Sequence, residues 1–185
     1  MKAEELIKAW DLPLRVFHWL LVVAFFIAYL TEDELLTVHV WAGYLVGGLL
    51  IFRILWGFIG NEYARFANFL CSPAVSIAYL KDLMQAKAKR YIGHNPAGAA
   101  MIVLLLLSLL MTVSTGLAVY GADKGAGLLA FIGNSHEEFW EEIHELFANF
   151  TVVLVVVHVI GVVAESIIHR ENLARAMFNG NKKRP

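Results

Sequence analysis

Four histidines stand in or at the edges of the strongly apolar segments of this chain. They are His18, His39, His144 and His158. An imidazole in an apolar helix is costly unless it has a partner, and imidazole nitrogens are good ligands for iron, zinc and copper. The chemistry that these residues could support is therefore coordination of a metal or of a metal-containing cofactor.

The spacing of two of these histidines argues against one shared metal ion. His144 and His158 are 14 positions apart, which on an α-helix is about 21 Å of rise and a rotation of about 40° from the same face. Tetrahedral zinc needs its ligands gathered around a single ion. One helix face would thus carry two ligands at different depths, and each would belong to a separate site.

The elements that must position these residues are four apolar blocks. The 185 residues are 59% hydrophobic and only 17% charged, with a mean hydropathy of +0.63. Each block has roughly the 20 residues that a helix needs to cross a bilayer. We predict an all-α integral membrane protein, a four-helix transmembrane bundle forming a single membrane domain over residues 1–185, with spans at about 12–30, 38–59, 97–120 and 143–168.

The distribution of basic residues predicts that both termini are cytoplasmic, because basic loops stay on that side. The two loops assigned to the outside together hold only Lys124. The inner loop and the tail hold ten basic residues: Arg65, Lys81, Lys87, Lys89, Arg90, Arg170, Arg175, Lys182, Lys183 and Arg184.

Two shorter features are predicted around the third span. Ala74 to Arg90 combines apolar and basic positions and predicts an amphipathic helix on the membrane surface, with an ordinary solvated linker helix as the alternative. Asn95 followed by Pro96 predicts an N-cap with proline at the first helical position. Gly121 to Glu142 is expected to be an acidic loop that contains glycine.

Antiparallel spans pair the four histidines by depth. His18 and His158 share the inner half, and His39 and His144 share the outer half. Two histidines from facing helices can hold the iron of a haem and leave no open position, which favours electron transfer over substrate binding. Gly43 and Gly161 would give a macrocycle room, although close helix packing explains glycines equally well.

Other classes of function fit less well. The net charge of −1 and the lack of a basic stripe argue against nucleic acid as a partner. A single cysteine, Cys71, leaves neither a c-type haem attachment nor a cysteine set for an iron–sulfur cluster. A transporter is disfavoured because the spans show no buried acidic centre, no broken helix pair and no duplicated half.

The chain resembles the bacterial cytochrome b-561 family, in particular the branch related to the cytochrome b subunit of nickel–iron hydrogenase. The similarity extends over nearly the whole chain. The stretches that carry it are Arg15–Trp19, His39–Tyr44, Arg53–Phe58, Ala64–Phe66, Gly93–Gly98, His144–Glu145, His158–Val162 and Glu171–Leu173. The turn after the first span is short for this family, which puts in doubt any partner contact made there.

The resemblance implies a four-helix core that holds two b haems, with His18, His39, His144 and His158 as axial ligands. It also implies electron transfer in the bacterial inner membrane between quinone and a redox partner, either a c-type cytochrome or a dehydrogenase or hydrogenase subunit. An electron-transfer subunit is favoured over a stand-alone enzyme. The alternative is a quinone-linked superoxide oxidase, and a homodimer stays open.

Secondary candidates lie at the inner ends of the spans. Arg15 and Arg53 could pair with haem propionates or simply extend to the interface. His94 could shape a quinone site with Arg53, or serve only as a capping or surface residue. His136 and His169 are interpreted as solvated. The acidic run Glu137, Glu138, Glu141, Glu142 and Glu145 is a solvated helical face that could attract a basic partner.

Overall fold

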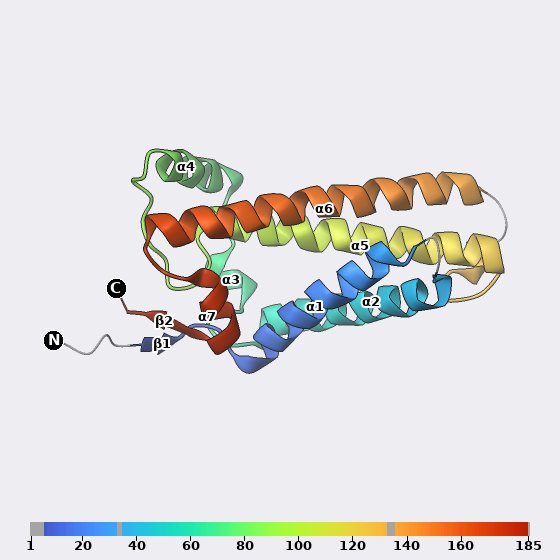
Figure 1. Cartoon of the computed structure of the whole chain (residues 1–185), viewed down its shortest axis with the longest axis horizontal. Helices are drawn as coiled ribbons and strands as arrows, with labels where there is room; N and C mark the ends of the chain where they lie inside the picture. Colours follow the sequence, from blue (N-terminus) through green and yellow to red (C-terminus); the bar gives the residue numbers. More distant parts are fainter. Residues whose placement is uncertain (1–5, 33–34, 133–135, 185) are drawn as a thin grey trace. The chain divides into compact units, whose positions relative to one another are not determined.

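Four long helices dominate the protein, as the sequence predicts. The computed structural model describes residues 6–32, 35–132 and 136–184. Within these ranges, four helices are long and apolar enough to cross a membrane: α1 (Leu12–Leu30), α2 (Leu36–Ile59), α5 (Pro96–Lys124) and α6 (Glu137–Ile168) (Figure 1). Large apolar side chains such as Leu107, Val153 and Ile160 are exposed along them. Lipid is the solvent that such surfaces require.

The third and fourth spans are longer than predicted. Residues 121–142 are not all loop, because α5 continues to Lys124 and α6 already begins at Glu137. Glu137 and Glu138 occupy the first turn of α6, where negative charge stabilises the amino end of a helix. The short 3-10 helix η1 (Ala130–Ile132) lies in the connection.

The start of α5 follows the predicted capping pattern. The Asn95 side chain accepts a hydrogen bond from the backbone N–H of Gly98 at 2.7 Å, and Pro96 is the first helical residue. The cap fixes where the third span begins. It also fixes the position of His94 directly before it.

The chain divides into two compact units, and the first of them comprises residues 1–19, 52–103 and 156–185. Besides ends of the long helices it contains α3 (Phe66–Phe69), α4 (Pro73–Met84) and α7 (Leu173–Asn179). It also contains strands β1 (Leu6–Lys8) and β2 (Asn181–Lys183), which pair antiparallel with Leu6 opposite Lys183 (Figure 1). The predicted amphipathic helix is α4, which ends at Met84 rather than Arg90.

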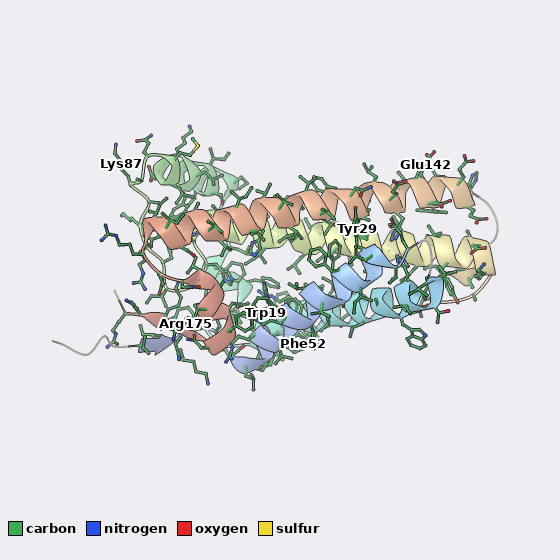
Figure 2. The ribbon with its side chains drawn as sticks, viewed as in Figure 1. Trp19, Tyr29, Phe52, Lys87, Glu142 and Arg175 are labelled. Atoms are coloured by element: carbon green, nitrogen blue, oxygen red, sulfur yellow. The ribbon has the colours of Figure 1, made fainter. Side chains whose placement is uncertain are left out.

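A buried ionic cluster ties the carboxyl-terminal segment to the rest of the first unit. Glu171 forms ion pairs with Arg90 at 2.9 Å and with Lys182 at 3.5 Å, and both Glu171 and Lys182 are buried. Burial alone would raise the pKa of Glu171, but hydrogen bonding from Arg90 and the charge of Lys182 outweigh it and lower the pKa. Trp19 of α1 stacks on Phe178 of α7, which holds the tail from another side (Figure 2).

The second unit comprises residues 20–51 and 104–155 and has its own apolar core. Polar side chains within it are paired: the Ser108 and Thr151 hydroxyls are 2.7 Å apart, and Tyr29 donates to Asn149 at 2.9 Å. In an apolar solvent such pairing removes the cost of the hydroxyl groups. The core residues are Ala24, Phe25, Val46, Leu50 and Leu109.

Candidate functional site

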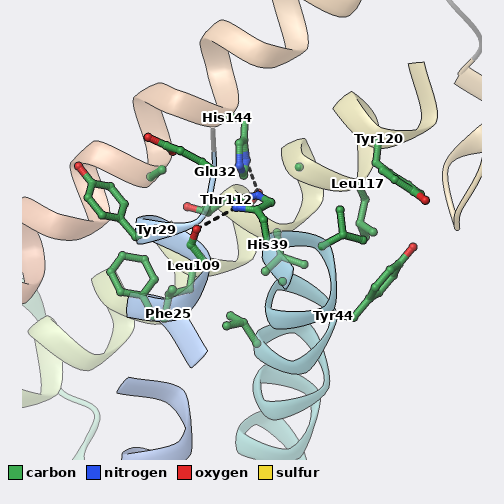
Figure 3. A pocket seen from close by; sticks show the side chains of 17 residues that line it. Phe25, Tyr29, Glu32, His39, Tyr44, Leu109, Thr112, Leu117, Tyr120 and His144 are labelled. Atoms are coloured by element: carbon green, nitrogen blue, oxygen red, sulfur yellow. Dashed lines mark hydrogen bonds between the residues drawn. The ribbon is translucent and has the colours of Figure 1, made fainter. Parts of the chain in front are cut away.

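His39 of α2 and His144 of α6 face each other inside the second unit. Their ring centroids are 6.0 Å apart, and the ring planes lie at 85° to one another (Figure 3). The two helices supply one ring each, from residues 105 positions apart in the sequence. The pairing therefore depends on the fold and is not a local feature of the sequence.

Both rings are anchored through the same nitrogen. His39 Nδ1 lies 2.9 Å from the carbonyl oxygen of Ala28, and His144 Nδ1 lies 2.9 Å from the carbonyl oxygen of Thr112 (Figure 3). A carbonyl can only accept, so each Nδ1 carries the hydrogen. The lone pair then resides on Nε2, which is the arrangement of a metal-ligating histidine with its second nitrogen bound to a carbonyl.

The dimensions of the His39–His144 pair fit an iron held between the two rings. Two metal–imidazole bonds of about 2 Å each, together with half of each ring, add up to roughly the observed centroid separation. A Cβ added to Gly43 would meet nothing within 4 Å, so the helix surface beside His39 is open. The surrounding hollow is lined mainly by apolar and aromatic side chains, including Phe25, Tyr44, Val46, Leu109, Leu117 and Tyr120.

Gly116 of α5 lies directly against the His144 ring, four residues after Thr112 on the same helix. A Cβ at this position would lie 2.8 Å from His144 Cε1 and 3.1 Å from its Nδ1. Glycine is needed here because any side chain would push the ring out of its place. Gly116 is a site residue that the sequence analysis missed, since its contact comes from a helix distant in sequence.

The first unit contains the other two histidines of the predicted set. His18 belongs to α1 and His158 to α6, and both fall within the same compact unit as His94. Burial, followed by the positive charges of Arg53 and Lys182, lowers the pKa of His94 to about 3. His94 is therefore neutral at physiological pH. Its ring packs between Trp10 and Phe69, at centroid distances of 4.6 Å and 4.7 Å, rather than standing free at the surface.

Several buried nitrogens of the first unit have no hydrogen-bond partner within the described part of the chain. They are Arg15 Nε, His18 Nδ1, Arg53 Nη1, His94 Nδ1 and His169 Nε2; the last lies at ion-pair distance from Glu165 but forms no hydrogen bond with it. Arg53 is only 3% exposed, and its guanidinium lies 4.6 Å from the centroid of the Phe66 ring. Buried donors without partners are costly. An anionic or carbonyl-bearing ligand would satisfy them, which fits haem propionates or a quinone.

Arg15 already forms a hydrogen bond with the carboxyl-terminal segment. It donates to the carbonyl oxygen of Phe178 at the end of α7, and Gly180 sits directly beside its side chain. Gly180 has a φ of +84°, a backbone conformation that favours glycine. Arg15 thus has a structural role, and its buried Nε remains available to a ligand.

Two expectations for this region are wrong. His169 is not solvated: its side chain is 13% exposed, and its Nε2 lies 3.2 Å from Glu165 Oε2. Glu165 itself is a buried acid, 8% exposed, inside the fourth span, where the sequence analysis found no acidic centre. Its position seven residues after His158, which is two helical turns on the same face, was the signal that could have found it.

Apolar spanning helices and facing histidines anchored through Nδ1 are the features of a membrane-bound cytochrome. Residues 9–180 match the family model described as prokaryotic cytochrome b561. The chain belongs to this family. It is accordingly a bacterial membrane protein that transfers electrons by means of haem b.

Curated relatives agree with this assignment. A "Probable Ni/Fe-hydrogenase B-type cytochrome subunit" of Rhodobacter capsulatus is 24% identical, over 95% of this chain and 81% of the relative. Proteins with the same description from Cupriavidus necator and Azotobacter vinelandii are each 27% identical; the matches cover 92% and 97% of this chain, and 84% and 90% of the relatives. No solved structure matches the chain significantly.

The contact between Gly116 and His144 yields a prediction. Gly116→Ala should lower the haem content of the purified protein, because the added methyl group collides with the His144 ring and pulls Nδ1 away from Thr112. Gly48→Ala is the matched control in the same unit, since a Cβ there meets nothing within 4 Å. The measurement is haem per chain by absorption. Equal haem content in both variants would show that the His144 ring position does not matter for haem binding.

Proposed function

We propose that this chain is a di-haem b-type cytochrome that passes electrons between the quinone pool and a redox partner. His39 and His144 would hold the outer haem, and His18 and His158 the inner one, with both termini cytoplasmic. The observation that carries the proposal is the His39–His144 pair, whose rings face each other at 6.0 Å with both Nδ1 atoms bound to backbone carbonyls.

The protein's contribution to this activity is to hold its ligands rigidly. A haem held by His39 and His144 would supply one-electron transfer. The carbonyls of Ala28 and Thr112 orient the two outer rings, and Gly116 leaves the space that one of them needs. In the first unit, the Arg15 Nε would pair with a propionate, which supplies the partner that this buried group lacks.

The inner site is where we place the quinone. His94 is neutral and its Nδ1 is buried without a partner, so it can exchange a hydrogen bond with a quinone oxygen. Arg53, also buried, offers a second donor. A quinone carbonyl accepts hydrogen bonds from such groups, and the negative charge that develops on reduction strengthens them.

The partner would dock on the outer side. Relatives of this chain are described as subunits of Ni/Fe-hydrogenase, so a hydrogenase-type redox subunit is the favoured partner and a c-type cytochrome is the second option. The exposed glutamates at the start of α6 would attract a basic surface on either. Asp33 and Glu34, two further acidic residues after the first span, lie outside the described residues.

A superoxide oxidase is the alternative function. An enzyme that oxidises anionic superoxide would need a basic approach to the outer haem. The amino end of α6 instead exposes Glu137, Glu138, Glu141, Glu142 and Glu145, which favours the electron carrier. A homodimer remains compatible with either function.

The ligand assignment predicts that the two histidines of α6 serve different haems. His144→Ala and His158→Ala should each remove one haem and different components of the reduced spectrum. Low-temperature difference spectra of the two purified variants check this, with His136→Ala as the control because His136 is exposed. Loss of the same component in both variants would refute the paired arrangement.

If quinone reacts at the inner site and the partner docks on the outer side, substitutions on the two sides should slow different reactions. Arg53→Ala should slow haem reduction by a quinol at any ionic strength, because the lost donor lies in the protein interior. Replacing Glu137, Glu138, Glu141 and Glu142 together by glutamine should slow only the reaction with a basic cytochrome, and only at low salt, since the Debye length is about 10 Å at 0.1 M.

Stopped-flow absorption measures both reactions, with the exposed Arg175→Ala as the control for Arg53→Ala. If the glutamine variant slowed quinol reduction and Arg53→Ala did not, the quinone and partner faces would be reversed.

A further inference from the structure

One face of α6 continues beyond the proposed inner haem ligand toward the end of the span. His158, Gly161, Glu165 and His169 follow each other at intervals of three, four and four residues. Residues at these intervals share one side of a helix. Two of the four, Glu165 and His169, carry groups that can exchange protons and are not proposed as haem ligands. At Gly161, an added Cβ would meet nothing within 4 Å, so the stripe is open between His158 and Glu165.

Glu165 is held between two protonatable side chains. Its Oε1 lies 2.8 Å from the hydroxyl of Tyr79 on α4, and its Oε2 lies 3.2 Å from Nε2 of His169. Glu165 and Tyr79 are buried, whereas His169 keeps 13% of its side chain exposed. The Tyr79 hydroxyl thus forms a hydrogen bond with one oxygen of this buried carboxyl group, and the partly exposed His169 lies at ion-pair distance from the other oxygen.

The hydrogen bonds of Tyr79 provide two positions for a proton. Its hydroxyl lies 2.8 Å from Glu165 Oε1 and also 3.0 Å from the carbonyl oxygen of Lys89. A phenol has one hydrogen and a carbonyl can only accept. When Glu165 is ionised, it accepts the hydrogen bond from the Tyr79 hydroxyl, and the Lys89 carbonyl then receives no hydrogen bond from Tyr79. A protonated Glu165 instead donates to Tyr79, which then donates to Lys89, and both contacts become full hydrogen bonds.

One cation near Glu165 in this cluster forms its ion pair with another carboxylate. Lys182 of β2 lies close enough to sense Glu165, but its ammonium group pairs with Glu171 and donates to the carbonyl of Tyr91. Burial, then the hydrogen bond to Glu165, raises the pKa of Tyr79 above its usual value, so the phenol stays neutral. Glu165 therefore has the Tyr79 hydroxyl at one oxygen and the His169 imidazole at the other, and His169 is its neighbour toward the surface.

We propose that Glu165, with Tyr79 and His169, conducts protons between the inner aqueous side and the quinone at the inner site. This rests on the proposed function. Reduction of one quinone to quinol takes two electrons, supplied through this chain by the redox partner, and two protons. The protons come from water by way of His169 and Glu165, and cross the open stripe at Gly161. Quinol oxidation runs the same exchange in reverse.

The test compares Glu165→Gln with Glu62→Gln in the purified haem-loaded protein. Glutamine keeps the shape of the side chain but cannot carry the proton, and Glu62 is an exposed carboxylate in the same unit. Haem is reduced with dithionite and re-oxidised by a short-chain quinone in stopped flow. Glu165→Gln should slow re-oxidation by at least about ten-fold, increasingly so at higher pH, with unchanged haem content. Glu62→Gln should match the wild type.

An infrared difference spectrum between oxidised and reduced protein gives a readout independent of turnover. The carbonyl stretch of a protonated carboxylic acid should respond to reduction, shift in heavy water, disappear in Glu165→Gln and persist in Glu62→Gln. Tyr79→Phe removes the hydroxyl but keeps the ring, so it should slow re-oxidation and shift this band. If Glu165→Gln loses its haem, Tyr79→Phe serves as the test variant in its place.

The proton route would be wrong if Glu165→Gln re-oxidised at the wild-type rate and kept the carboxyl band. The same result in Tyr79→Phe would count where Glu165→Gln loses its haem. Either result would leave the proposed function intact. A wild-type protein that holds haem but does not react with quinone would instead overturn the proposed quinone function itself, and with it this inference.

Discussion

The absence of water around the spanning helices is the constraint on which the other features of this protein depend. Each polar side chain placed in such a helix must find a partner within the protein or in a bound cofactor. Ser108 and Thr151 satisfy each other, and His39 and His144 satisfy one nitrogen each with a backbone carbonyl. The nitrogens that remain unsatisfied are therefore informative, because they indicate where the protein expects a ligand.

The unsatisfied groups differ between the two units. In the second unit the Nδ1 atoms of His39 and His144 are bound to carbonyls, which leaves their Nε2 atoms as the possible ligands, beside a hollow lined mainly by apolar side chains that suits a macrocycle. In the first unit the orphaned nitrogens also include two guanidinium groups and His94. This richer set of donors fits a site that must satisfy propionates and exchange hydrogen bonds with quinone. The buried Glu165 adds a group that can move protons there.

The sequence was sufficient for the architecture because four apolar blocks of membrane-spanning length allow few other folds. It also predicted the Asn95 cap, whose signal is local. It did not predict α7, the β1–β2 pair or the ion cluster of Glu171, because these depend on contacts between the chain ends and residues far away in sequence.

In the candidate site, too, the sequence predicted what depends on spacing and missed what depends on contacts distant in sequence. Histidine spacing led to the depth pairing of His18 with His158 and of His39 with His144, and each of these pairs falls within one compact unit. Gly116 and the surroundings of Glu165 could not be anticipated, since a contact between α5 and α6, or between α4 and α6, has no periodic signature. The exposure of His169 was misjudged because sequence position near a chain end does not reveal what folds over it.

The proposed function depends on two haem sites in one chain, one in each compact unit. The most direct measurement is a pyridine haemochrome assay on the protein purified in detergent, combined with a protein determination and with oxidised and reduced spectra. We expect close to two b-type haems per chain. A single haem per chain, or a colourless preparation, would contradict it.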